Sequence, residues 1–429
     1  DGSKLVAVGG GSAKTIDTGT GKATNYPISM RIRIDREQES SEKFLEAASI
    51  MGEIFYDPEM KGLDWPALTE RYHELAARTR TADEFNWVSN RLLGELSASH
   101  MGMRAPAKNM PLSQSIGRLG VDLEPVADGY LVTSVLEDGP AEASDMPLLI
   151  GDVITGINLE PLDLDATPPD TVGGRLRGRL GKEVVVTVRR QPELDAADGP
   201  AESLELDLLL TPISNGAIRG LVYDATQRRR AEQVHEWSNG RLGYAHVRSM
   251  DQASLDEFER DLFAATEGRD GLVVDVRDNG GGWTTDRLLS SIMAPAHAYT
   301  IPRGADRSVV DTYPQDRLFI QRYLMPMNMI CNEKSYSNAE IVSHAFKNLD
   351  RGTLVGQRTN GSVISTGGTS LIDGTTLRLP FRGWYLPNGA DMENNGAMPD
   401  IVVDQTPEDE AADHDAQLRA AVVDLMRRL

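Results

Sequence analysis

The stretch Asn332-Glu333-Lys334-Ser335-Tyr336-Ser337-Asn338-Ala339-Glu340 joins a predicted strand to a predicted helix. The apolar run before it, Met327–Cys331, is short enough for a buried strand, and apolar residues after it recur at helical spacing. A serine at this junction lies where unpaired helix N–H groups favour negative charge, as an oxyanion-forming nucleophile requires. Taken alone, however, the stretch favours a simpler interpretation, in which Ser337 caps the helix and Glu340 completes a capping box.

Length and charge limit what the chain can be. Its 429 residues exceed what one core usually accommodates, so we expect roughly two to four domains. The 65 acidic and 44 basic residues give a net charge of −21, which argues against nucleic acid or an anionic membrane as partner. No apolar run is long enough to span a bilayer. The single cysteine, Cys331, excludes an intrachain disulfide, and its apolar surroundings predict a buried, inert thiol.

The N-terminal third changes from strand to helix periodicity. Residues 1–36 alternate apolar and polar residues around turns, which predicts strands, the last at Met30–Ile34. These strands are too few to close a barrel or sandwich, and no leader segment precedes them, so we expect a fragment of something larger. Residues 37–110 have helical spacing, with Asp83 predicted to cap the last helix before a serine–histidine pair, Ser99-His100. The predicted apolar faces comprise Phe44, Ala47, Ala48, Met51 and Phe55, then Leu68, Tyr72, Leu75 and Ala76.

Residues 111–213 have a different pattern. Strands predicted at Gly129–Val135 and Val184–Val188 flank the step Gly151-Asp152-Val153-Ile154. This order resembles a PDZ domain of the bacterial protease type. Such a domain would bind an extended peptide as an additional strand at its edge.

Residues 214–412 predict an α/β domain, followed by a C-terminal helix at 413–429. The cluster Arg228-Arg229-Arg230 is either a solvated helix face or a contact with an acidic neighbour or a peptide carboxylate. A buried strand at 271–277 precedes Asp278-Asn279-Gly280-Gly281-Gly282. These glycines could form a phosphate cradle, an oxyanion hole or only a turn. They match neither the Walker nor the dinucleotide pattern, which weighs against phosphate.

Several motifs in fixed order now resemble one family. They are Glu95-Leu96 before Ser99-His100, the PDZ-like segment, Asp275 to Gly282, the stretch around Ser337, and Glu393-Asn394 before Pro399-Asp400. Over residues 37–429 this order is similar to the C-terminal half of the tricorn branch of the carboxy-terminal processing (tail-specific) serine peptidases. The resemblance implies a multidomain α+β protein with a helical segment, a PDZ domain and a crotonase-like catalytic domain. It also implies that residues 1–36 end an upstream β-propeller.

The resemblance also implies roles for individual residues. Ser337 matches the nucleophile, His100 the general base, Ser99 the serine that orients this histidine, and Glu393 the carboxylate that completes the tetrad. The backbone N–H groups of Gly281 and Asn338 match the oxyanion donors, although the family more often has aspartate at position 338. Gly280 and Gly282 would contact substrate, and the choice among the three glycines is uncertain by one position.

Other candidates receive structural interpretations. We expect Ser335 to be a turn residue, Asp275 and Asp278 to support loops, and Trp283 to pack beside the site. The remaining histidines have no partner pattern, and we expect structural or exposed positions for His73, His235, His246, His297, His344 and His414. Neither a metal nor a cofactor is predicted.

The sequence therefore predicts a serine endopeptidase that acts on unfolded polypeptides or oligopeptides. Two alternatives remain: a peptide-binding PDZ scaffold with an unproductive peptidase-like domain, and a crotonase-type acyl-thioester enzyme. The resemblance implies a hexamer and a cytoplasmic location, while an exported location stays open.

Overall fold

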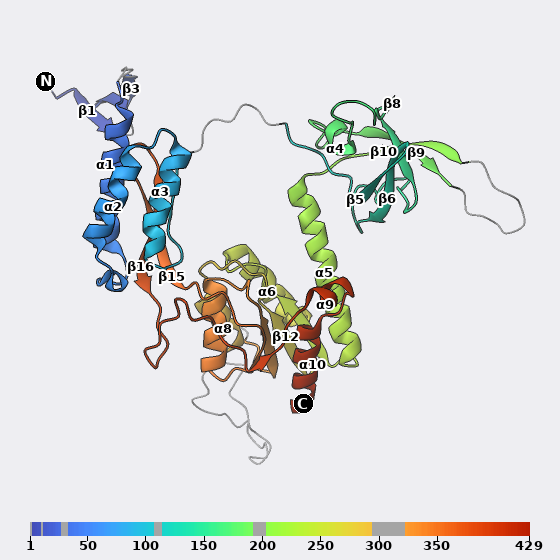
Figure 1. The fold of residues 1–429 in the computed structure, drawn as a ribbon. Coiled ribbons are helices and arrows are strands. Elements are labelled where there is room, and N and C mark those ends of the chain that lie inside the picture. Colours follow the sequence, from blue (N-terminus) through green and yellow to red (C-terminus); the bar gives the residue numbers. More distant parts are fainter. Residues whose placement is uncertain (1, 10–11, 27–32, 107–113, 192–202, 294–321) are drawn as a thin grey trace, which may run out of the picture. The chain divides into compact units, whose positions relative to one another are not determined.

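The computed structural model describes residues 2–9, 12–26, 33–106, 114–191, 203–293 and 322–429 (Figure 1). The chain forms two compact units. The first contains Asp1–Pro106 and Ser365–Arg382, and the second contains Ala107–Ile364 and Gly383–Leu429. Most of the strand predicted at Met30–Ile34 lies outside the described residues. None of the helices in the described part of the chain is both long and apolar enough to cross a membrane.

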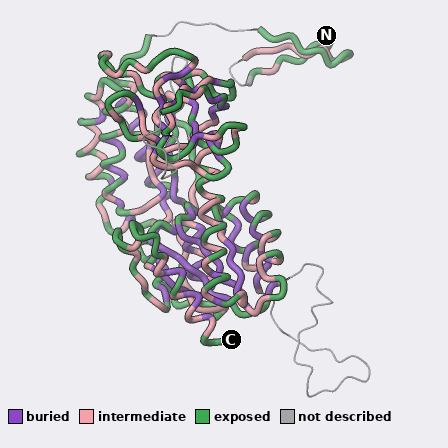
Figure 2. Tube along the Cα trace, turned by 90° about the vertical axis from the view of Figure 1, so that its right-hand side faces the viewer, coloured by how far each residue is buried: buried purple, intermediate pink, exposed green. Residues whose placement is uncertain are grey.

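Three N-terminal strands form an antiparallel sheet in the order β1-β2-β3. Their bounds are Lys4–Gly9, Ser12–Asp17 and Ala23–Tyr26. None of their residues with described burial is buried, as the green and pink N-terminal strands in Figure 2 show. Val6 and Val8 are 75% and 80% exposed, so apolar side chains of this sheet face solvent.

Three helices follow, α1 (Arg36–Ile54), α2 (Trp65–Ala77) and α3 (Ala82–Glu95), with a short 3-10 turn at Met60–Gly62. The predicted cap at Asp83 was wrong, because Thr81 accepts the Glu84 N–H and Glu84 reaches back in a capping box. Leu75, predicted to be buried, is 52% exposed. The other apolar faces form the core of this unit.

A second chain segment completes the same unit. Strands β15 (Ile364–Ser370) and β16 (Thr376–Gly383) form a sheet with β4 (Gly102–Arg104), in the order β15-β16-β4. Leu377 and Leu379 pack into the helical core, and the buried Lys43 ammonium pairs with Asp373 at 2.7 Å. The strand after the Ser99-His100 pair is therefore held by Thr376, Leu377 and Arg378, which lie far along the chain.

The segment predicted to be a PDZ domain is an antiparallel sheet in the order β10-β9-β7-β6-β5, with β8 paired to β7. Its strands are Val121–Val126, Gly129–Val135, Val153–Ile157, Glu160–Pro161, Val184–Arg190 and Leu204–Leu210, and a short helix, α4, spans Val172–Arg175. Asp152 explains the Gly-Asp-Val-Ile step. This carboxylate is 1% exposed and accepts hydrogen bonds from the Leu149 N–H and the Arg190 guanidinium.

The α/β part of the second unit contains five parallel strands in the order β11-β12-β13-β14-β17. Their bounds are Leu242–His246, Gly271–Asp275, Met327–Cys331, Thr353–Gly356 and Ile401–Val402. The helices of this part are α5 (Asn215–Trp237), α6 (Gln252–Ala264), α7 (Thr285–Ile292), α8 (Asn338–Asn348), α9 (Pro407–Ala411) and α10 (Ala416–Arg428). The predicted strand at Met327–Cys331 is confirmed at both ends.

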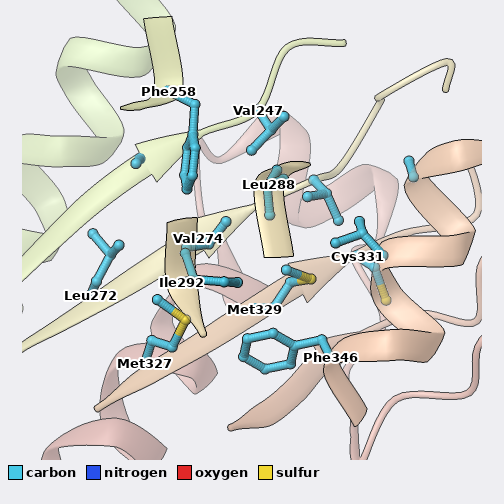
Figure 3. Packing of buried hydrophobic residues seen from close by; sticks show 14 of the residues in the cluster. Val247, Phe258, Leu272, Val274, Leu288, Ile292, Met327, Met329, Cys331 and Phe346 are labelled. Atoms are coloured by element: carbon cyan, nitrogen blue, oxygen red, sulfur yellow. The ribbon is translucent and has the colours of Figure 1, made fainter. Parts of the chain in front are cut away.

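Helices cover both faces of this sheet. On one face, side chains of α6, α7 and α8 pack on β12 and β13, as Phe258, Leu288 and Phe346 show in Figure 3. On the other face, α5 and α10 pack on alternate residues of the same strands, for example Val273 and Ile330. Every residue of β12 and β13 is consequently buried, as the continuous apolar runs predicted.

A buried ionic network ties α5 and α10 to the end of β12. The Arg277 guanidinium, 3% exposed, donates to both Asp275 and Asp415, and Arg230 of α5 pairs with the same two carboxylates. Although burial of Asp275 opposes its ionisation, the guanidinium groups of Arg277 and Arg230 hold its pKa below the usual range. The contact of the basic cluster with acidic neighbours is therefore confirmed, and Arg228 also pairs with Glu137 and Asp138.

Arg277→Met should destabilise the α/β part by about 3–5 kcal/mol, because it leaves the Asp275 carboxylate buried without its main partner. Arg229→Met is the matched control, since Arg229 pairs with Asp413 at the surface and should contribute about 0–1 kcal/mol. Urea unfolding followed by circular dichroism would measure both variants. Equal small shifts for the two variants would contradict the assigned role of the network.

Candidate functional site

Ser337 lies at the N-cap of α8, directly after the loop that follows β13. Its backbone has φ 56° and ψ −116°, whereas an ordinary N-cap residue has β-region angles. Such a conformation is rare for a residue with a side chain and costs about 1–3 kcal/mol, which the surrounding structure must supply. Ser337 is thus held on a sharp turn between β13 and α8, directly before the residues that carry the first N–H groups of that helix.

Glu340 supports this turn. Its Oε1 accepts the Ser337 N–H at 3.0 Å, which is the glutamate half of the predicted capping box. Unlike an ordinary capping glutamate, this side chain is fully buried. Its remaining acceptor positions are taken by Ser362 N–H, Gly361 N–H and Thr359 Oγ1. Local spacing predicted only a capping role for Glu340, and the contacts of this side chain with residues 359–362 could not be found from that spacing.

The glycine run lies against the nucleophile. Gly281 has φ 88°, and a Cβ placed on it would lie 2.7 Å from Ser337 Cβ and 2.6 Å from the Tyr336 carbonyl oxygen. The Gly281 N–H donates to Asn279 Oδ1 at 2.9 Å, so this predicted oxyanion donor has an acceptor within its own loop. Gly280 and Gly282 flank it and are exposed.

Asn338 connects two helix N-termini. Its Oδ1 accepts the Thr285 N–H of α7, and its carbonyl oxygen accepts the Thr285 hydroxyl, both at 2.9 Å. The amide oxygen of Asn338 accepts the Thr285 N–H without adding negative charge beside Ser337. Trp283 was predicted to pack beside the site, but its side chain is 60% exposed.

The loop before Ser337 is fixed by buried polar contacts. Ser335, predicted to be a turn residue, is fully buried and donates to the Val276 carbonyl oxygen at 2.8 Å. Asn332 Oδ1 accepts a hydrogen bond from the Asp278 backbone N–H, and the Asn332 side-chain NH₂ group donates one to the Asp278 carboxylate. These contacts join the ends of β12 and β13, so Asp278 supports the loop as predicted.

Ser99 and His100 form a close pair in the first unit. Ser99 Oγ lies 2.7 Å from His100 Nδ1, and the Thr366 hydroxyl donates to the His100 carbonyl oxygen at 3.4 Å. Burial, with a smaller contribution from the positive charge of Arg378, lowers the pKa of His100 to about 4. The imidazole is therefore neutral at pH 7 and able to accept a proton.

Glu393 is 2% exposed, and its Oε2 accepts the Val363 N–H at 2.8 Å. The predicted residues therefore fall into two groups. Ser337, Gly281, Asn338 and Glu393 belong to the second unit, whereas Ser99 and His100 belong to the first.

Four of the other histidines have side-chain partners in the described part of the chain, and His235 is exposed. His246 Nε2 lies 3.0 Å from the Arg277 carbonyl oxygen, which can only accept, so Nδ1 must accept the Tyr223 hydroxyl. The other three side-chain pairs are His73 with Ser41, His344 with the Asn395 carbonyl oxygen and His414 with Asp409. His297 lies outside the described residues. Cys331 is buried, and burial raises the pKa of its thiol, as predicted.

Metal ligands are not grouped in the described part of the chain: no cluster of three or more His, Cys, Asp and Glu side chains there could hold an ion.

Gly281→Ala should destabilise the second unit by about 2 kcal/mol or more, because the added methyl overlaps the Ser337 turn and φ 88° strains alanine. Gly280→Ala provides the matched control, since a Cβ there has no atom within 4 Å. Thermal unfolding of both variants would test this. A Gly281→Ala protein as stable as the control would contradict the close approach.

Comparison with known proteins shows similarity to one group of peptidases. Residues 241–403 match peptidase family S41, residues 36–94 match the tricorn protease C1 domain, and residues 117–208 match a PDZ domain. "Tricorn protease homolog 1" of Streptomyces coelicolor is 32% identical over 416 residues, covering 93% of this chain and 36% of that protein. The tricorn protease of Thermoplasma volcanium is 29% identical over 395 residues, covering 90% of this chain and 36% of its own length.

A solved structure agrees. The crystal structure of the tricorn protease superposes with a TM-score of 0.75 at 23% identity, covering 97% of this chain and 40% of the other, which supports the fold. The chain spans about a third of the length of the curated relatives it matches. The chain thus carries segments that match peptidase family S41, the tricorn C1 domain and a PDZ domain, and it is similar to tricorn proteases over more than nine-tenths of its length.

Proposed function

We propose that this protein is a serine endopeptidase that hydrolyses unfolded polypeptides or oligopeptides through an acyl-enzyme, with Ser337 as nucleophile. The observation that carries the proposal is the strained Ser337 turn, held at the N-terminus of α8 against the backbone of Gly281. Strain of this kind persists only where other contacts maintain it, and it concentrates at active sites.

In the proposed reaction, Ser337 Oγ attacks the scissile carbonyl carbon while His100 accepts the hydroxyl proton. Ser99 occupies Nδ1 of the imidazole, so Nε2 is the nitrogen assigned to this transfer. The tetrahedral intermediate collapses as His100 returns the proton to the leaving amine. A water molecule then repeats the sequence on the acyl-enzyme, releasing the acid and restoring Ser337. A positioned base of this kind contributes about a hundredfold to ten-thousandfold.

The remaining roles follow from the same hypothesis. Glu393 would hold Ser99, and Ser99 would fix the tautomer of His100, as an aspartate does in the common triad. The Asn338 N–H at the start of α8 would stabilise the oxyanion. The second donor would come from the glycine run, and Gly281 would have to turn its N–H from Asn279 Oδ1 or share it. Each such donor is worth about a hundredfold or more.

Other features belong to the proposal as well. The parallel sheet with helices on both faces is the part we assign to a crotonase-like catalytic domain, and β1–β3 would end a propeller. The PDZ domain would bind an extended peptide by strand addition. Assembly into a hexamer is carried over from the family.

Ser337→Ala should lower peptide hydrolysis by about a thousandfold or more and abolish labelling by a fluorophosphonate. Digestion of a peptide library, read by mass spectrometry, would measure the first effect and also give the cleavage preference. Ser290→Ala, which removes an exposed hydroxyl on α7, is the control. A chain that binds peptides but is neither labelled nor active would favour the scaffold alternative.

The pH dependence should report His100. Catalysis needs the neutral imidazole, so kcat/KM should stay level as the pH falls below 6.5 and halve only near pH 4. Arg378→Met removes a positive charge that disfavours protonation and should move this limb to higher pH. Arg382→Met, on the same strand, is the control. Circular dichroism at each pH would separate titration from acid unfolding, and a limb near pH 6.5 in the unaltered protein would contradict the burial of His100.

A further inference from the structure

The second unit contains two buried carboxylates whose hydrogen bonds reach the same short segment. Glu340 of α8 is fully buried and Glu393 is 2% exposed. Residues 359–363, here called the 359–363 loop, lie between them in the hydrogen-bond network. Loop amides bind both side chains.

Glu340 is surrounded by donors. Oε1 accepts the Ser337 N–H at 3.0 Å and the Ser362 N–H at 2.8 Å. Oε2 accepts the Thr359 hydroxyl at 2.7 Å and the Gly361 N–H. A carboxylate offers about four such acceptor positions, and all four are filled. One donor is the nucleophile's own backbone, and the other three belong to the 359–363 loop.

These contacts favour the ionised form. A protonated Glu340 would have to donate a hydrogen bond, but three of its four partners are backbone N–H groups, which cannot accept one. The fourth partner, the Thr359 hydroxyl, donates to Oε2 and accepts the Ala397 N–H at 2.7 Å. Burial raises the pKa of the Glu340 carboxyl, while the hydrogen bonds oppose this rise. The negative charge is therefore maintained by directed backbone dipoles rather than by a cationic side chain.

The other end of the loop holds Glu393. The Val363 N–H donates to Glu393 Oε2, and the next residue, Asn394, donates its N–H to the Gly361 carbonyl oxygen at 2.7 Å. Thr359 and Ala397 exchange two further hydrogen bonds. The segment that carries Glu393 is thus fastened to the same loop that Glu340 fixes.

We propose that Glu340 is a positioning residue that sets the backbone of Ser337 and the location of Glu393 together, with the 359–363 loop as the connection. This inference rests on the proposed peptidase function and adds a residue to it. One buried side chain keeps the nucleophile in its strained conformation. Through the loop, the same side chain fixes the carboxylate assigned to the other end of the tetrad.

Glu340→Gln tests the proposal with almost no change in volume. In either orientation, the new NH₂ group faces at least one backbone N–H, because Oε1 binds two of them and Oε2 binds one. Thr359→Val is a milder variant for Glu340, since it removes one of its four donors and leaves the three backbone N–H groups in place. It also removes the acceptor of the Ala397 N–H. Glu333→Gln makes the same charge change at an exposed position in the loop before Ser337 and is the matched control.

We expect kcat to fall about a hundredfold in Glu340→Gln and less in Thr359→Val, with KM nearly unchanged, because misplacement of catalytic groups costs about this much. Glu333→Gln should retain the activity of the unaltered chain. If Glu340→Gln does not fold, Thr359→Val decides the question. A folded variant with unchanged kcat would overturn the proposal, because the contact would then be structural only.

Hydrogen exchange gives a readout that does not need activity. In the Ser337→Ala background, Glu340→Gln should increase exchange of the amides of residues 361–363 about tenfold or more, relative to Glu333→Gln. Unaltered exchange would overturn the connection through the loop even if the chain is a peptidase. Increased exchange in a chain without any peptidase activity would support the connection while the proposed function fails.

A double-mutant cycle tests the coupling itself. If Glu340 acts partly through Glu393, the kcat loss in Glu340→Gln with Glu393→Gln should be smaller than the product of the two single losses. A multiplicative loss would overturn the coupling and leave Glu340 as a local support for Ser337.

Discussion

The pairing of β12 with β13 is the constraint on which the site depends. These parallel strands are neighbours, with Asp275 in register with Ile330, so the segments that leave their carboxyl ends must lie side by side. One segment is the glycine run and the other leads to Ser337. A side chain at position 281 would overlap the serine turn, and glycine is therefore required there for close approach as well as for its positive φ.

Buried charge maintains this arrangement from two sides. Just before the glycine run in the chain, the Arg277 guanidinium donates hydrogen bonds to Asp275 and Asp415 and so attaches α10 to the end of β12. Beside the nucleophile, Glu340 takes donors from α8 and from the 359–363 loop. Both networks are expensive to bury and costly to break, because removing one partner leaves the others without hydrogen bonds in a low-dielectric interior. They restrict the loops more than apolar contacts would.

Local pattern predicted most elements but failed where neighbours distant in sequence decide. The predicted strands Met327–Cys331 and Gly129–Val135 agree with the structure because turns and apolar periodicity bound them. The predictions for Asp83 and Leu75 were wrong for different reasons. Thr81, two residues before Asp83, is the N-cap and forms the capping box, and Leu75 lies outside the face of its helix that the core covers. Trp283 was predicted to pack, yet it is exposed after the glycine turn.

Motifs a few residues long were enough to identify the order of segments, the resemblance to tricorn peptidases and the residue types available for acyl transfer. The assignments of Ser337, His100, Ser99 and Glu393 remain proposals. The strained backbone of Ser337 and the hydrogen bonds by which Glu340 joins it to residues 359–362 are visible in the folded chain alone. Hydrogen bonds between segments some twenty residues or more apart leave no periodic signal, since they depend on where packed strands and helices bring the backbone.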